Sequence, residues 1–63
     1  MTVEQIMAIV ADIQNMRFDD EAAHGAEDGL WGSVLAEIAS GKAEDPAALA
    51  SAALQTRSIK FSR

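Results

Sequence analysis

The sequence holds a single histidine, and acidic residues surround it at helical spacing. The cluster comprises Asp20, His24, Glu27 and Asp28. On a helix each acid would lie about one turn from the histidine, and carboxylates at that distance favour the charged imidazolium. Such groups serve in acid–base catalysis. However, catalysis also needs a nucleophile and an oxyanion stabiliser in a cleft, and the residues around His24 offer neither.

The same cluster is a poor candidate for a metal or cofactor site. It offers one imidazole nitrogen and several carboxylate oxygens, so further ligands would have to come from other helices or other chains. Cysteine is absent, which removes thiolate ligands. The sequence also lacks the motifs of phosphate loops, serine hydrolases, zinc proteases and calcium loops. We therefore predict a protein that is not an enzyme and holds no cofactor or metal, with a solvated helix start at this cluster.

Hydrophobic periodicity predicts the helices that carry these groups. The apolar spacing fits three helices in one all-α domain, over about residues 2–16, 20–40 and 46–57. This domain takes in the whole of residues 1–63. The tail after the third helix alternates polar and apolar residues and is too short for a sheet. We expect this tail to be extended and to dock over the open end of the bundle through Ile59 and Phe61.

The ends of the predicted helices carry good capping residues. Side chains at these positions accept hydrogen bonds from backbone N–H groups that have no partner within the helix. Gly41 fits the left-handed position that ends the second helix. The predicted N-caps are Thr2 with Gln5 completing a capping box, Asp19 or Asp20, and Asp45 followed by Pro46.

The first predicted helix is unusually apolar. Its hydrophobic stripe covers about half of the circumference, whereas a core-facing helix needs about 100°. A chain of 63 residues without a disulfide also buries little surface, so its stability is marginal. We therefore expect a homodimer at micromolar concentration, formed through Ile6, Ile9, Val10, Ile13 and Met16.

The second predicted helix has two contrasting faces. One is a large apolar stripe made of Leu30, Trp31, Val34, Leu35 and Ile38. Its tryptophan is interpreted either as a core residue or as the anchor of an interface. The opposite face, called here the small-residue face, consists of Ala22, Gly25, Gly29, Gly32 and Ala36. This face either lets another backbone approach closely or is a weak stretch of helix kinked near Gly29.

Charge is distributed unevenly along the chain. The net charge is −5, and all ten acidic residues lie within residues 1–45. Residues 46–63 carry Arg57, Lys60 and Arg63 and no acid. An acidic chain is a poor ligand for nucleic acid or anionic membranes, and a helix-turn-helix interpretation fails because the helices carry acids. No signal peptide or membrane-spanning run is present, so we expect a cytoplasmic protein.

The second half of the chain contains a recognisable combination of short stretches. They are DDEAAH at 19–24, VLAEIA at 34–39, DPAALA at 45–50, ALQT at 53–56 and IKFSR at 59–63. Over residues 19–63 this combination resembles a group of small helical proteins encoded by bacteriophages, prophages and their bacterial hosts. The resemblance implies a small helical fold and a phage association. It implies no functional residue, because no activity is established for the group.

A phage association favours one class of function. Phages encode small acidic proteins that block host machinery, including anti-CRISPR proteins, and an acidic surface can occupy a basic groove that normally holds phosphate. We therefore predict a non-enzymatic binding protein that inhibits a host nucleic-acid-handling or defence complex. The predicted acidic patch consists of Asp19, Asp20, Glu21, Glu27 and Asp28. The alternative is an assembly module that self-associates through the first helix or the small-residue face.

Overall fold

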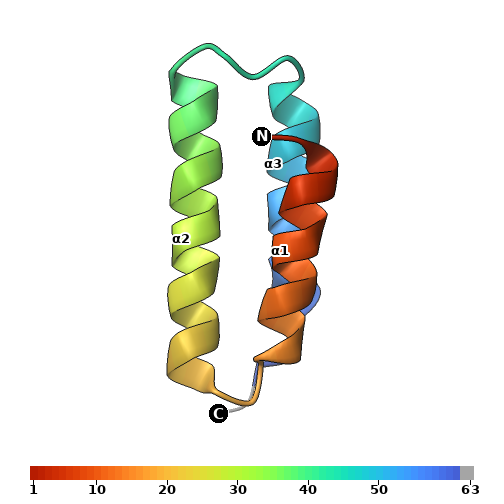
Figure 1. Ribbon diagram of the computed structural model, residues 1–63, viewed down its shortest axis with the longest axis vertical. Coiled ribbons are helices and arrows are strands. Elements are labelled where there is room, and N and C mark those ends of the chain that lie inside the picture. Colours follow the sequence, from red (N-terminus) through yellow and green to blue (C-terminus); the bar gives the residue numbers. More distant parts are fainter. Residues whose placement is uncertain (62–63) are drawn as a thin grey trace.

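The computed structural model describes residues 1–61, which form three α-helices and one short 3-10 helix. These elements are α1 (Val3–Asn15), α2 (Asp20–Ala39), α3 (Pro46–Ala53) and η1 (Leu54–Ser58). α1 and α3 pack side by side and run in the same direction, and α2 runs antiparallel to both (Figure 1). The predicted all-α three-helix fold is confirmed. Ser62 and Arg63, the end of the predicted tail, lie outside the described residues.

Side-chain caps begin α1 and α2 at the predicted positions. Thr2 and Gln5 form the capping box: Thr2 Oγ1 accepts from the backbone N–H of Gln5 at 3.0 Å, and Gln5 Oε1 accepts from that of Thr2 at 2.9 Å. Asp19, and not Asp20, is the N-cap of α2, where its carboxylate accepts from the N–H of Ala22 at 3.3 Å. Each cap satisfies backbone donors that the first helical turn leaves unpaired.

The loop between α2 and α3 is shaped by its two ends. Gly41 has φ +79°, the left-handed conformation that glycine adopts without steric cost, and its N–H donates to the carbonyl of Ile38 at 3.1 Å. At the other end Asp45 accepts from the N–H of Ala48 at 3.1 Å, and Pro46 follows at the first helical position. The chain therefore reverses over a few residues and starts α3 with a satisfied N-terminus.

The core lies between the three helices and receives one apolar stripe from each. α1 contributes the two largest fully buried side chains, because Ile6 and Ile13 are 0% exposed. α3 contributes mainly alanines, whose small side chains allow its backbone to lie close to the other helices. The buried apolar residues are Ile6, Val10, Ile13, Ala23, Leu30, Val34, Leu49, Ala52, Ala53 and Ile59.

Most of the apolar stripe of α1, which was predicted to form a dimer interface, lies in the core of the single chain, and the homodimer itself stays a prediction. Ile6, Val10 and Ile13 are buried within the single chain, and they are unavailable to a second copy. Ile9 and Met16 are half-buried and packed against the same core. The physical reason is that α2, α3 and η1 all pack against α1, so three elements together cover the wide stripe.

The third helix changes type before its predicted end at residue 57. α3 ends at Ala53, and η1 continues the chain as a tighter 3-10 helix. At this point the Ala53 carbonyl accepts the indole N–H of Trp31 at 3.1 Å and the hydroxyl of Thr56 at 3.2 Å. Because these side chains occupy the carbonyl that the next α-helical turn would use, the helix tightens there.

The length of α2 sets the dimensions of the bundle, which measures 36 × 16 × 14 Å. Twenty residues at about 1.5 Å each span about 30 Å. Within residues 1–61, no helix combines the length and the apolar character that crossing a membrane requires.

Candidate functional site

His24 lies between two carboxylates in the N-terminal half of α2. Its Nε2 is 3.5 Å from Asp20 Oδ1, and its Nδ1 is 3.3 Å from Glu27 Oε1. An imidazolium can donate to both oxygens, whereas a neutral ring can donate to only one. The side chains of His24 and Asp20 are 44% and 40% exposed, whereas that of Glu27 is only 15% exposed. The cluster predicted from the sequence therefore forms with two of its three acids.

This cluster lacks the other components of a catalytic or metal site. Asp28 is exposed and is not one of the carboxylates that face the ring. Asp20 Oδ1 is buried without a hydrogen bond in the part of the chain that the structure describes, so its contact with His24 is an ion-pair distance only. Within residues 1–61 no three His, Asp or Glu side chains are placed to hold a metal ion. The arrangement is a polar contact among side chains that lie one turn apart on α2.

The C-terminal tail docks on this cluster. Ile59 has extended backbone angles (φ −76°, ψ 132°) and a buried side chain. Phe61 is half-buried, and its ring stacks on that of His24 with centroids 4.1 Å apart and planes 27° from parallel. Over residues 59–61 the tail is therefore docked as predicted, with Ile59 buried in the core and Phe61 on His24 of α2.

Trp31 forms hydrogen bonds with the residues around η1, the segment that precedes the tail. Its side chain is half-buried against the core, and its indole N–H is shared between the Ala53 carbonyl at 3.1 Å and Thr56 Oγ1 at 3.0 Å. Thr56 is fully buried and donates its own hydroxyl to Ala53. Of the two interpretations of Trp31, the structure supports the core residue. The polar end of the indole fixes η1 on α2.

The five acids of the predicted patch fall into two groups. Asp20 and Glu27 contact His24, and the Glu27 side chain is only 15% exposed. Its position on the helix falls close to the buried stripe that contains Ala23 and Leu30, which explains the low exposure. The exposed acids, called here the open patch, are Asp19, Glu21 and Asp28.

The small-residue face of α2 points away from the bundle. All five of its residues are exposed. A Cβ atom added at Gly25, Gly29 or Gly32 would meet no heavy atom within 4 Å among the described residues. Within residues 1–61 no other backbone therefore approaches these glycines, and α2 continues as one helix through them. Leu35, which is 64% exposed, lies on the same outer side of α2.

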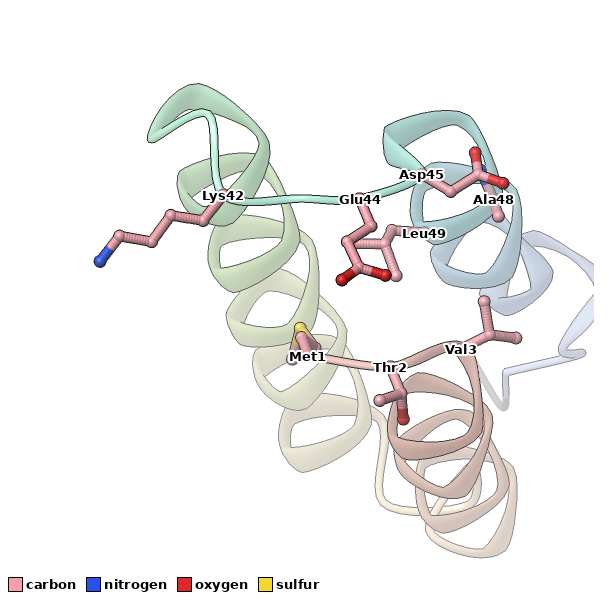
Figure 2. A pocket seen from close by; sticks show the side chains of 8 residues that line it. All are labelled: Met1, Thr2, Val3, Lys42, Glu44, Asp45, Ala48 and Leu49. Carbon is pink, nitrogen blue, oxygen red and sulfur yellow. The ribbon is translucent and has the colours of Figure 1, made fainter.

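A pocket of about 410 Å³ lies at the opposite end of the bundle from the tail. Figure 2 shows the side chain of Glu44 reaching into this space and that of Lys42 pointing away from it. The N-caps of α1 and α3 form part of the wall, and their side-chain oxygens already accept backbone N–H groups. None of the predicted site residues lines the pocket. Its wall consists of Met1, Thr2, Val3, Lys42, Glu44, Asp45, Ala48 and Leu49.

Two contacts at the site were not predicted from the sequence. The stack between Phe61 and His24 joins residues that are far apart in the chain, as does the bond between Trp31 and Thr56. For the bond between Trp31 and Thr56, the only sequence signal was that a tryptophan near the core needs an acceptor for its N–H. Neither pairing follows from periodicity.

Comparison of the chain with family models, curated proteins and solved structures finds no match. The functional interpretation therefore depends on the geometry and charge of the chain itself.

Proposed function

We propose that the chain is a non-enzymatic binding protein whose open patch engages a basic surface on a protein partner. The observation that carries this proposal is the exposure of Asp19, Glu21 and Asp28 at the N-cap and along the first half of a helix that contains no lysine or arginine. No basic side chain pairs with any of these three acids in the described part of the chain. Among residues 1–61, therefore, no basic side chain neutralises their charge.

The partner best matched to such a patch is a protein that normally holds nucleic acid. Lysine and arginine side chains that bind phosphate attract carboxylates by the same electrostatic interaction. Together with the resemblance to phage proteins, this leads us to propose an anti-CRISPR-like inhibitor of a host nucleic-acid-handling or defence complex. Under this proposal the protein acts in the cytoplasm and binds neither nucleic acid nor membranes directly.

A pull-down from bacterial lysate with matched charge variants tests the proposal. The patch variant is Glu21→Lys with Asp28→Lys. The control is Glu4→Lys with Asp12→Lys, which changes the net charge equally at two exposed acids of α1. Proteins captured by the wild type and the control at low salt should be lost with the patch variant and released at higher salt. Equal capture by all three proteins would exclude the open patch as the binding surface.

This pair of substitutions avoids Glu27, because most of its side chain is buried against the bundle. Replacing it would disturb the contact with His24 and confuse loss of binding with loss of structure. Circular dichroism checks that both variants remain helical. Glu21 lies in the first turn of α2, so its replacement by lysine costs about 0.3–1 kcal/mol through the helix dipole.

A second candidate function is self-assembly through the small-residue face. The observation in its favour is that this face is exposed over four turns and open at all three glycines. Closely packed helices would make such a contact insensitive to salt, in contrast to binding through acids. Light scattering of the wild type and of Gly29→Gln at several salt concentrations tests it. A dimer that persists at high salt and is lost in Gly29→Gln would support assembly.

A further inference from the structure

We propose that residues 59–61 form a C-terminal latch that closes over the acidic start of α2 and competes with basic ligands there. The inference rests on the proposed function, because it concerns access to the same acidic segment. The latch begins at the buried Ile59 and ends where Phe61 stacks on His24. In the closed state His24 is held between the latch and the carboxylates of Asp20 and Glu27.

The two ends of the latch are held very differently. At the inner end, η1 is fixed by the buried Thr56, whose hydroxyl joins the Trp31 indole and the Ala53 carbonyl. At the outer end, Phe61 is half-buried and stacks on a histidine that is itself 44% exposed. The latch should therefore open from Phe61 while η1 stays in place, because the outer contact is only half-buried, has no hydrogen bond among the described residues and has the more accessible partner.

The charge of the latch matches the surface that it covers. Residues 46–63 contain basic residues and no acid, and Lys60 is exposed between the two docked side chains. The first half of α2 contains acids and no lysine or arginine. The latch thus places one basic residue of the chain, Lys60, beside the acidic segment. A basic ligand that approaches the start of α2 meets a site that the latch already partly covers.

Opening the latch changes what the acidic segment presents. With Phe61 released, the ring of His24 loses its stacking partner and can rotate away from the two carboxylates. Asp20 Oδ1, which is buried without a hydrogen bond in the described part of the chain, and the largely buried Glu27 then become available to an external donor. The open patch would gain two carboxylates next to the exposed Glu21.

Binding of an oligolysine peptide at low salt tests the latch. Phe61→Ala should bind the peptide about two- to tenfold more tightly than the wild type, which is the range that the loss of one aromatic contact corresponds to. The matched control is Leu54→Ala, which removes an exposed apolar side chain from η1 without touching the latch. It should bind with the Kd of the wild type. If Phe61→Ala fails to fold, His24→Gln removes the same stack from the other side and should give the same gain.

The outcomes separate the latch from the proposed function. If neither the wild type nor the opened variants bind oligolysine, the acidic segment is no binding surface and both proposals fail. If the wild type binds, Glu21→Lys with Asp28→Lys weakens binding, and Phe61→Ala leaves the Kd unchanged, the proposed function stands and the latch is overturned. Weaker binding by Phe61→Ala also overturns the latch, because Phe61 would then belong to the binding surface.

Discussion

The indole N–H of Trp31 reaches the hydroxyl of Thr56 at 3.0 Å, across 25 residues of sequence. Both groups meet at the carbonyl oxygen of Ala53, where α3 gives way to η1. Thr56 is completely buried, so its hydroxyl depends on these neighbours for hydrogen bonding. This contact fixes the C-terminal segment on α2 and determines the direction in which the tail leaves the bundle.

Removing either partner of this contact should destabilise the fold. Trp31→Phe deletes the indole donor, and Thr56→Val deletes the hydroxyl with little change of volume. Each should lower the free energy of unfolding by about 1–2 kcal/mol, the usual effect of losing a partly buried hydrogen bond. Urea denaturation followed by circular dichroism measures both variants. The double variant should lose less than the sum, by about 0.5–1.5 kcal/mol, because the two groups interact directly. Strict additivity would contradict the contact.

The burial of the α1 stripe predicts unequal effects of two alanine substitutions. Ile13→Ala should cost about 2–5 kcal/mol of unfolding free energy, since it leaves a cavity in the core. Met7→Ala, at a site that is 40% exposed, should cost less than about 1 kcal/mol. Urea denaturation compares the two. Similar losses at both positions would mean that α1 is rotated relative to the arrangement described above.

The open glycines predict a gain of stability on substitution. Gly29→Ala should raise the free energy of unfolding by about 0.5–1 kcal/mol, because alanine favours the helix and its Cβ meets no neighbour. Gly41→Ala is the contrasting variant. It should cost about 1 kcal/mol or more, because φ at Gly41 is +79°. Thermal melts should separate the two by several degrees. A loss of stability in Gly29→Ala would show that something packs closely on this face in solution.

The N-cap of α3 predicts a loss of stability that depends on whether the side chain at position 45 can accept a hydrogen bond. Asp45→Ala removes the acceptor for the N–H of Ala48 and should cost about 0.5–2 kcal/mol. Asp45→Asn retains an acceptor oxygen and should have a much smaller effect. Chemical denaturation of the two variants distinguishes capping from general disturbance of the loop. Equal losses in both would indicate that the charge, not the hydrogen bond, is what matters at this position.

Local signals predicted the helices well, because the interactions that end a helix are close in sequence. Thr2 with Gln5, Asp45 with Pro46, and Gly41 each act within a few residues, so their types and spacing were sufficient. The end of α3 was not predictable in this way. It depends on Trp31, which comes from another helix and takes the carbonyl of Ala53.

Burial of the candidate site residues was harder to predict than their secondary structure. The width of the α1 stripe led to the prediction that a second copy of the chain packs on it. Within one chain the alanine-rich α3 already covers part of this stripe, and the few large apolar residues of α3 did not predict that contact. Glu27 and Asp28 are neighbours in sequence, yet one turns toward His24 and the other stays exposed. One residue along a helix changes the direction of a side chain by about 100°. A small error in predicting which side of the helix faces the core therefore assigns a buried acid to the surface, or an exposed acid to the core.

The place of Trp31 also gives the protein an intrinsic optical reporter. It is the only tryptophan, and the chain has no tyrosine, so ultraviolet emission comes from one position on α2. Its indole is bonded to the segment that carries the tail, and part of the ring remains at the surface. Detachment of η1 would replace these bonds with water and shift the emission to longer wavelength. The docking of the C-terminal segment can therefore be followed in dilute solution without attaching a dye.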